Sequence, residues 1–188
     1  AIDERSSIVP VIMSIKTGSK VIAMVAPSIV GQFGLKVKAD QIYTALKMAG
    51  FADVVEVAIG ADIVSVEEAE EYIEKVPAKQ PFMTSSCCPA FVNIVKKYVP
   101  DAADKVSHTV SPMVATGRWL KEQYPDATTV FIGPCIAKKG EAKGYPEYID
   151  YVLTFEEAMC LMEGKDIKVE NVEAAEFERD GSKVGLGF

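Results

Sequence analysis

Two of the four cysteines lie directly beside a proline, in two separate segments, and a third is adjacent to one of them. Cys87 and Cys88 are adjacent and precede Pro89, whereas Cys135 follows Pro134. Adjacent cysteines rarely form a disulfide with each other without strain, so this pair calls for another explanation. Thiolates that converge from different segments suit a soft metal ion or an iron–sulfur cluster. Two buried structural thiols are the alternative, and the residue types alone leave both open.

Acidic residues gather upstream of the cysteine pair. On pattern alone, such a run ordinarily forms a solvated helix face. The single histidine, His108, is expected to have a capping or packing role. Cys160 lies in an apolar stretch and is expected in the core, because free cysteine is among the most buried residue types. The acidic residues are Glu67, Glu68, Glu70 and Glu71.

An alternation of strands and helices is expected to position these side chains. Residues 20–26 form a continuous apolar run, which is typical of a strand buried on both faces. Ser65, with Glu68 three residues later, and Thr154 are the expected N-caps of two helices. The expected strands cover residues 20–26, 53–58, 80–83, 128–132 and 151–153. The expected helices cover residues 38–49, 65–76, 89–98, 112–124 and 154–162.

Strands separated by helices of this length predict an α/β fold. Right-handed crossovers should give a mainly parallel sheet with helices on both faces. Ligands of such folds bind at the carboxyl ends of the strands. Three strand-exit segments should meet at that edge: Pro27–Ser28, Cys87–Pro89 and Pro134–Cys135. The sequence therefore predicts that Cys88 and Cys135 approach each other there, near Pro27.

The composition excludes several classes of protein. The chain has 188 residues, of which 49% are hydrophobic, and a formal net charge of −7. A packed core is therefore expected, and nucleic acid is a poor partner. No run approaches the ~20 apolar residues of a membrane span. Few cysteines and no secretion signal favour a reducing compartment, here the cytoplasm. The chain lacks an initiator methionine and ends on an apolar segment, so residues 1–188 are expected to be part of a longer chain.

Two motifs resemble the cysteine signatures of one family, the iron-only or [FeFe] hydrogenases. Residues 84–92, TSSCCPAFV, resemble the first signature, T-S-C-C-P-x-W. Residues 133–141, GPCIAKKGE, resemble the second, M-P-C-x-x-K-K-x-E. The segment 25–28 and the acidic residues after Gly60 also resemble family segments. The match follows the family's order over nearly the whole chain.

The resemblance implies a domain that holds the H-cluster. This cofactor is a [4Fe–4S] cubane joined through a cysteine sulfur to a two-iron unit with carbonyl, cyanide and azadithiolate ligands. By the resemblance, Cys88 and Cys135 would be cubane ligands. Pro27 and Ser28 would line the two-iron pocket, and Lys138 would hydrogen-bond a cyanide.

The resemblance also implies the reaction, the reversible reduction of protons to hydrogen. Cys87 would bind no metal and would pass protons to the bridgehead amine. Glu71, Ser107 and Glu68 match the relay that continues to the surface, with Glu71 expected next to Cys87. The implied partners are hydrogen and protons, a ferredoxin-type or other electron carrier, and maturation proteins.

The chain departs from the family pattern at several positions. It has one extra serine in the first signature, Phe91 where Trp is usual, and Gly133 where catalytic members commonly have Met. The third signature, E-x-M-x-C-x-x-G-C-x-x-G-G-G-Q, which supplies the other two cubane ligands, is absent. The chain is therefore expected to be the N-terminal lobe of the H-cluster domain and to be inactive alone.

Two rival functions stay open from the sequence. A non-catalytic relative could be a hydrogen sensor, which Gly133 favours, or an iron–sulfur assembly protein, which Cys87 disfavours. The other rival is a plain α/β binding module whose thiols are structural.

Overall fold

A four-stranded parallel sheet forms the centre of the protein. The computed structural model describes residues 5–175, 181, 182 and 185. The strand order is β2-β1-β3-β4, and each neighbouring pair is parallel. The strands are β1 (Val21–Val25), β2 (Asp53–Glu56), β3 (Thr128–Gly133) and β4 (Tyr151–Thr154). The α/β class predicted from the sequence is confirmed.

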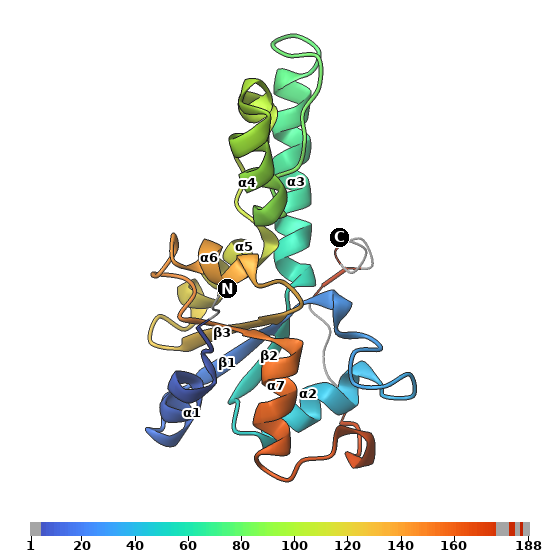
Figure 1. The fold of residues 1–188 in the computed structure, drawn as a ribbon, viewed down its shortest axis with the longest axis vertical. Coiled ribbons are helices and arrows are strands. Elements are labelled where there is room, and N and C mark those ends of the chain that lie inside the picture. The colour runs from blue at the N-terminus through green and yellow to red at the C-terminus, as the bar shows by residue number, and fades with distance from the viewer. Residues whose placement is uncertain (1–4, 176–180, 183–184, 186–188) are drawn as a thin grey trace.

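Helices lie above and below this sheet. Figure 1 shows α1, α2 and α7 below it and α5 and α6 above it. The helices are α1 (Ile8–Lys16), α2 (Ala39–Met48), α3 (Ala58–Lys75), α4 (Pro89–Tyr98), α5 (Pro112–Gln123), α6 (Ala137–Ala142) and α7 (Phe155–Glu163). Thr154 is the N-cap of α7, as predicted, in a capping box with Glu157.

The apolar strand pattern explains where the core lies. All five residues of β1 are fully buried, as expected for a strand between two layers of helices. In the parallel ladder, Val25 of β1 pairs with Ile132 of β3. The two strands therefore end at the same level, and the segments that follow them leave from the same edge of the sheet.

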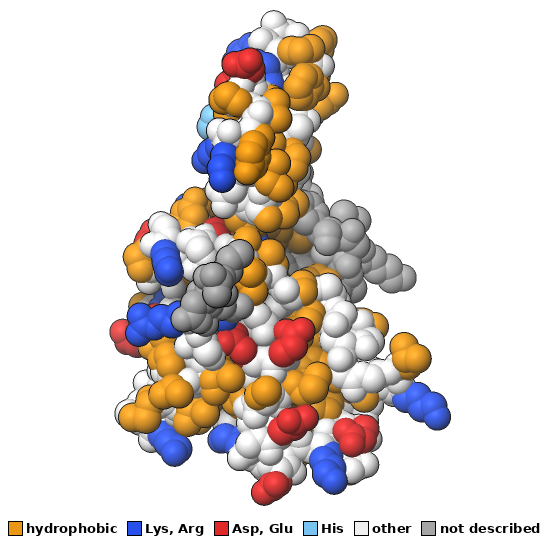
Figure 2. Space-filling model, in the orientation of Figure 1, with side chains coloured by type: hydrophobic (Ala, Val, Ile, Leu, Met, Phe, Trp, Pro, Cys, Tyr) orange, Lys and Arg blue, Asp and Glu red, His pale blue; other side chains and the backbone are white. Residues whose placement is uncertain are grey.

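A long projection rises from this edge. Helices α3 and α4 both project beyond the sheet and, with the segments that join them and lead to α5, form what we call the arm (residues 58–109) (Figure 1). Figure 2 shows hydrophobic side chains along its surface. The exposed apolar residues of the arm include Val66, Ile73, Phe82, Ile94 and Tyr98.

Several local predictions were wrong. Residues 80–83 are not a strand of the sheet, since the only pairing nearby is an isolated bridge between Thr84 and Val106. Helix α3 begins at Ala58 rather than Ser65, whose hydroxyl donates to the Ala61 carbonyl within the helix (2.8 Å). Helix α1 was not predicted, because its run of β-branched residues does not have a clear helical pattern. Ala1 and residues 186–188, part of the basis for expecting a longer chain, lie outside the described residues.

Candidate metal and proton-relay site

Two of the predicted segments leave neighbouring strands at the carboxyl edge. Pro27 follows β1 and begins a short 3-10 helix, Pro27–Ile29. Cys135 follows β3 by way of Pro134 and is half-buried. The Ala26 N–H donates to the Ile132 carbonyl (2.9 Å), which extends the strand pairing up to these segments. The parallel sheet thus places the Pro27 and Cys135 segments side by side, as the sequence predicts.

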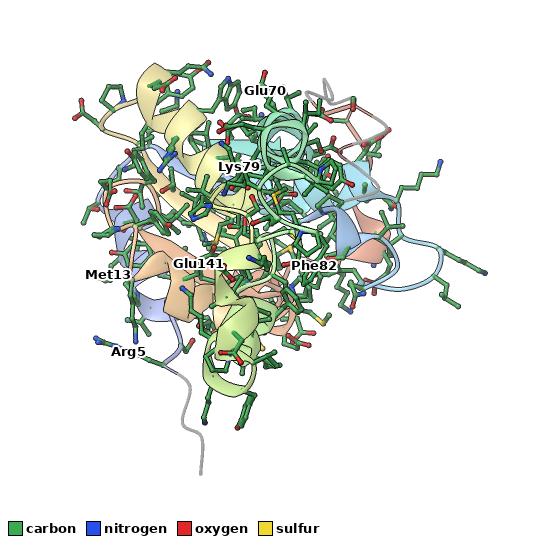
Figure 3. The ribbon with its side chains drawn as sticks, turned by 90° about the horizontal axis from the view of Figure 1, so that it is seen from above. Arg5, Met13, Glu70, Lys79, Phe82 and Glu141 are labelled. Carbon is green, nitrogen blue, oxygen red and sulfur yellow. The ribbon has the colours of Figure 1, made fainter. Side chains whose placement is uncertain are left out.

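The cysteine pair reaches this region by a different route from the one predicted. It does not follow a strand of the sheet, and Cys88 is instead the N-cap residue of α4, with Pro89 in the first turn. Helix α4 packs against α6, and Figure 3 shows Glu141 of α6 beside α4. The Lys138 ammonium donates to the Cys87 carbonyl (3.1 Å) and to Glu141 (2.8 Å). Lys138 therefore joins the Cys87 segment to the helix that follows Cys135.

All four cysteines are free thiols. Cys88 is exposed, and Cys87 is half-buried. Cys160 is also exposed, so the prediction that it packs in the core was wrong: its neighbours Leu161 and Met162 occupy the buried face of α7. The close approach of the Cys88 and Cys135 sulfur atoms stays a prediction.

Glu68 lies next to the cysteine segment. Its carboxylate accepts hydrogen bonds from the Ser85 hydroxyl (2.9 Å), the Ser86 N–H (3.0 Å) and the Thr109 hydroxyl (3.2 Å). The Ser85 hydroxyl in turn accepts from the Cys87 N–H (3.3 Å). The order expected for the relay was therefore wrong, because the carboxylate beside the cysteines is Glu68 and not Glu71.

Glu71, one helical turn farther along α3, is the outer carboxylate. It accepts from the Ser107 hydroxyl (2.5 Å), the Lys75 ammonium (2.6 Å) and the backbone N–H of His108 (3.1 Å), and its Oε1 lies 2.7 Å from His108 Nδ1. Burial of Glu71 would raise the pKa of its carboxyl, but the hydrogen bonds from Lys75, Ser107 and His108 outweigh it and lower the pKa from 4.5 to about 2. Glu71 is therefore ionised at neutral pH.

One hydrogen-bonded network joins the two carboxylates. The Ser107 and Thr109 hydroxyls are 2.9 Å apart, and each also bonds one of the carboxylates. Because a hydroxyl both donates and accepts, this arrangement can transfer protons. The network runs from Glu71 through Ser107 and Thr109 to Glu68 and ends at the cysteine segment.

Three members of this network were missed or misassigned from the sequence. Lys75 lies four residues after Glu71, a helical spacing that favours ion pairs, so its partner could have been found. No pattern in the sequence identified Thr109 as a member of this network. His108, expected to cap or pack, is 73% exposed and borders Glu71 at the outer end of the network.

A close helix contact places α3 where it can hold both carboxylates. Gly60 of α3 packs so tightly on α5 that a Cβ there would lie 2.3 Å from the Pro112 carbonyl oxygen and 2.3 Å from the Thr116 hydroxyl. Glycine is thus required by the approach of the two helices. This contact anchors the base of the arm, eight residues before Glu68.

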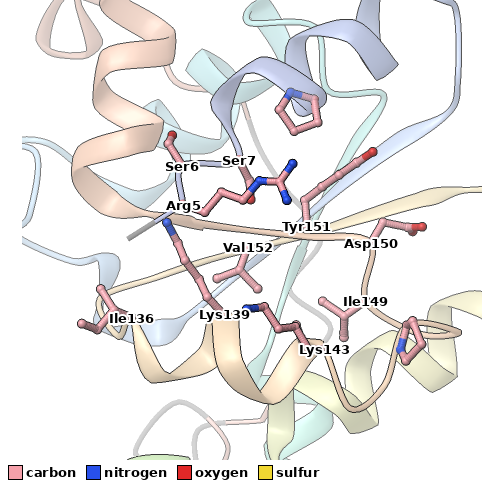
Figure 4. A pocket seen from close by; sticks show the side chains of 13 residues that line it. Arg5, Ser6, Ser7, Ile136, Lys139, Lys143, Ile149, Asp150, Tyr151 and Val152 are labelled. Atoms are coloured by element: carbon pink, nitrogen blue, oxygen red, sulfur yellow. The ribbon is translucent and has the colours of Figure 1, made fainter. Parts of the chain in front are cut away.

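Two hollows flank the site. One of about 590 Å³ borders the network and is lined by Ser107, Thr109 and Glu141 among others. Another, of about 800 Å³, lies between the N-terminal segment, α6 and β4 and is lined in part by Ile136, the residue after Cys135. Figure 4 shows Arg5, Lys139 and Lys143 around it. The second hollow includes none of the predicted site residues.

The donor set fits part of an iron–sulfur site. Thiolates are the ligands that iron–sulfur clusters require, and the accessible thiols Cys88 and Cys135 are of this type. Within the part of the chain that the structure describes, no three His, Cys, Asp or Glu side chains are grouped so that they could hold a metal ion. A [4Fe–4S] cluster takes four ligands, so two cysteines fit two of its positions.

The fold and these segments define an α/β domain with thiols and a hydrogen-bonded network of carboxylates and hydroxyls beyond the carboxyl edge of a parallel sheet. Residues 19–187 match the model of the iron-only hydrogenase large subunit, C-terminal domain. The chain belongs to this family, as the sequence motifs predict.

Relatives of known name agree with this assignment. The chain is 32% identical to iron hydrogenase 1 of Clostridium pasteurianum, over 85% of this chain and 31% of that protein. It is 32% identical to the periplasmic [Fe] hydrogenase large subunit of Nitratidesulfovibrio vulgaris, over 65% of this chain and 33% of that protein. It is 28% identical to the NADP-reducing hydrogenase subunit HndD of Solidesulfovibrio fructosivorans, over 71% of this chain and 26% of that protein.

Solved structures share the fold. The apo [FeFe]-hydrogenase HydA1 of Chlamydomonas reinhardtii, variant C377H, superposes with a TM-score of 0.80 at 23% identity. The match covers 97% of this chain and 54% of that one. The chain thus spans 26–33% of the length of the named relatives and 54% of this solved structure. None of the helices in the described ranges is long and apolar enough to cross a membrane.

Proposed function

We propose that this chain is the N-terminal lobe of an H-cluster domain and takes part in the reversible reduction of protons to hydrogen. The observation that carries the proposal is the contact between Lys138 and the Cys87 carbonyl, because it joins the two cysteine segments. The proton network that ends at the same segment supports it. The family membership of the chain supplies the chemistry.

Each matched residue has a role in this proposal. Cys88 and Cys135 are two of the cubane ligands, and the other two come from outside this chain. Pro27 and Ser28 line the pocket of the two-iron unit. Lys138 has three N–H donors, of which Glu141 and the Cys87 carbonyl take two. The third N–H is available for a cyanide ligand. The Lys138 side chain is only 12% exposed, so the surrounding residues restrict its orientation. When bound, the H-cluster supplies the iron chemistry that interconverts protons, electrons and hydrogen.

The network delivers protons to Cys87. A proton enters at the exposed His108, which borders the mostly buried Glu71, passes the Ser107 and Thr109 hydroxyls, and reaches Glu68. From Glu68 it moves to Ser85 or Ser86. Among the described residues no hydrogen bond reaches the Cys87 sulfur, so the last transfer needs a water molecule or a rotation of the Ser85 hydroxyl.

Electrons come from a second protein. A ferredoxin-type or other electron carrier is the proposed donor, and maturation proteins are the proposed source of the two-iron unit. Both belong to the activity of a complete domain, of which this chain is one part.

The test separates the two adjacent cysteines. In the complete native polypeptide, Cys88→Ser should lose the cubane iron, since thiolate ligation holds it. Cys87→Ser should keep the iron and lose most hydrogen evolution from reduced viologen, because a hydroxyl is a far weaker acid than a thiol of pKa about 8.5. Cys160→Ser is the matched control and should keep both. Residues 1–188 alone should show no turnover after anaerobic reconstitution.

Two outcomes would redirect the proposal. Full activity of Cys87→Ser would remove Cys87 from the proton route. A complete set of carbonyl and cyanide infrared bands from the cluster, with little turnover in the wild-type polypeptide, would favour a hydrogen sensor. Gly133 is the residue in this chain that favours the same alternative.

A further inference from the structure

Gly133 has its side-chain position filled by another residue. It is the last residue of β3, buried and directly before Pro134 and Cys135. A Cβ on Gly133 would lie 2.6 Å from Cε1 and 2.7 Å from Cζ of the Phe131 ring, and 3.3 Å from the Ala26 Cβ. Carbon atoms do not approach to 2.7 Å without a shift of one of them. The Phe131 ring is only 4% exposed, so close packing opposes that shift.

The strand geometry accounts for this arrangement. Side chains two residues apart on a strand point to the same face, so Phe131 and position 133 share one side of the sheet. The far end of the ring reaches the side-chain position of Gly133 at the carboxyl end of β3, and Ala26, the residue after β1, borders the same position. This is the level from which the Pro27 and Cys135 segments leave.

We infer that the Phe131 ring takes the place of a side chain at position 133 and forms the wall of the pocket beneath the Pro27 and Cys135 segments. Phe131 and Gly133 are then a matched pair, in which the large residue requires the small one. The assignment of this wall to the cofactor pocket rests on the proposed function. The pairing itself rests only on the packing.

The wall has a definite chemical character. A phenyl edge carries no hydrogen-bond donor and no lone pair, and the ring leaves no room for water at the side-chain position of Gly133. A methionine at position 133 would instead offer a soft thioether sulfur. Polar contacts to a group bound here must therefore come from other sides, such as Lys138. The glycine is not a vacancy in the site, because the aromatic ring occupies the space.

A double-mutant cycle on the metal-free chain tests the pairing. Phe131→Ala leaves a cavity and Gly133→Met overpacks the strand end, and each should raise the unfolding equilibrium constant at least ~10-fold in guanidinium titrations. The double variant returns the lost volume. Its unfolding constant should be at least ~10-fold smaller than the product of the two single effects predicts. Effects that simply multiply would overturn the inference.

The control pair is Phe131→Ala with Gly140→Met. Gly140 of α6 has nothing within 4 Å of a Cβ position, so these two effects should multiply. If Phe131→Ala does not fold, Phe131→Leu with Gly133→Ala repeats the cycle with smaller changes.

The rate at which Cys135 is alkylated in the folded chain reports directly on whether the Phe131 ring shields it. Cys87, Cys88 and Cys160 are replaced by serine so that one thiol reacts. Phe131→Ala should speed the reaction with iodoacetamide several-fold, and the double variant should restore the slow rate. An unchanged alkylation rate in Phe131→Ala would show that the ring does not shield the Cys135 segment. Both readouts need no iron, so failure of the complete native polypeptide to bind a cluster would count against the proposed function and leave the pairing intact.

Discussion

The sheet and the arm bring cysteines to the same region, but they are built in different ways. Cys135 is held by the sheet, because the backbone pairing between β1 and β3 determines where the chain leaves β3 relative to the end of β1. Cys87 and Cys88 are held by the arm, which touches the rest of the protein where α3 packs on α5 at Gly60, where α4 packs on α6, and through polar side chains such as Lys138. We therefore expect that a change at the base of the arm shifts the cysteine pair without unfolding the sheet, whereas Cys135 cannot move without disturbing the pairing of β1 and β3.

The largest expected effect is at the base of the arm. Gly60→Ala places a methyl group against the Pro112 carbonyl and the Thr116 hydroxyl, so α3 must separate from α5. Overpacking of this kind should cost about 2–3 kcal/mol in the free energy of unfolding, measured by guanidinium titration.

Gly140→Ala is the matched control, since it is also a helical glycine but has open space around it. It should be neutral or stabilise the protein by up to about 1 kcal/mol, because alanine is the better helix former. If the two variants lose equal stability, the close contact at Gly60 does not anchor the arm.

The next effect is the pH dependence of the outer carboxylate. The pKa of Glu71 is about 2 in the folded protein, below its ordinary value of 4.5. The ionised group therefore stabilises the folded state fully above about pH 4.5, and this contribution disappears as the pH falls towards 2. Glu71→Gln should remove that part of the acid dependence in unfolding titrations between pH 5 and pH 2.

Glu67→Gln removes the same charge from an exposed position on α3 and is the control. It should retain the wild-type acid dependence. Parallel curves for Glu71→Gln and the wild type would mean that Lys75, Ser107 and His108 do not hold the carboxylate as the contacts indicate.

A smaller effect is expected at the start of α7, where Thr154 ends β4 and pairs with Gly133. The Thr154 hydroxyl accepts from the Glu157 N–H (3.2 Å), and the Glu157 carboxylate accepts from the Thr154 N–H (2.8 Å). Thr154→Ala should cost about 1 kcal/mol, the usual value of an N-cap. The reaction of Cys87 and Cys88 with a thiol reagent should not change, whereas Gly60→Ala should alter it. A changed rate in Thr154→Ala would show that the two regions are coupled.

Much of the sheet could be predicted because its signals are local. The continuous apolar run at 20–26 identifies β1, and the capping pattern at Thr154 identifies the start of α7. Alternating strands and helices then determine that the sheet is parallel and which edge carries Pro27 and Cys135. These inferences need only neighbours in sequence and general rules of chain connection.

The arm could not be predicted in the same way because long-range contacts build it. Residues 80–83 are extended and apolar enough to suggest a strand, yet they lie beyond the sheet, where no partner strand is available. The order of Glu68 and Glu71 depends on which side chains from residues 85–109 face α3. Phe131 could not be linked to Gly133 from the sequence, because the position of its ring is decided by packing in the buried strand end.

The most direct test of the account is the distance between the thiols of Cys88 and Cys135. Dibromobimane becomes fluorescent when both of its arms react, so it reports two thiols within its short reach. In the metal-free chain with Cys87→Ser and Cys160→Ser, the account predicts a fluorescent cross-link within one molecule. The control with Cys87→Ser and Cys135→Ser leaves Cys88 and the exposed Cys160 of α7, and it should stay dark. Single labelling of Cys88 and Cys135 without a cross-link would contradict the claim that the arm and the sheet present these cysteines to one cluster.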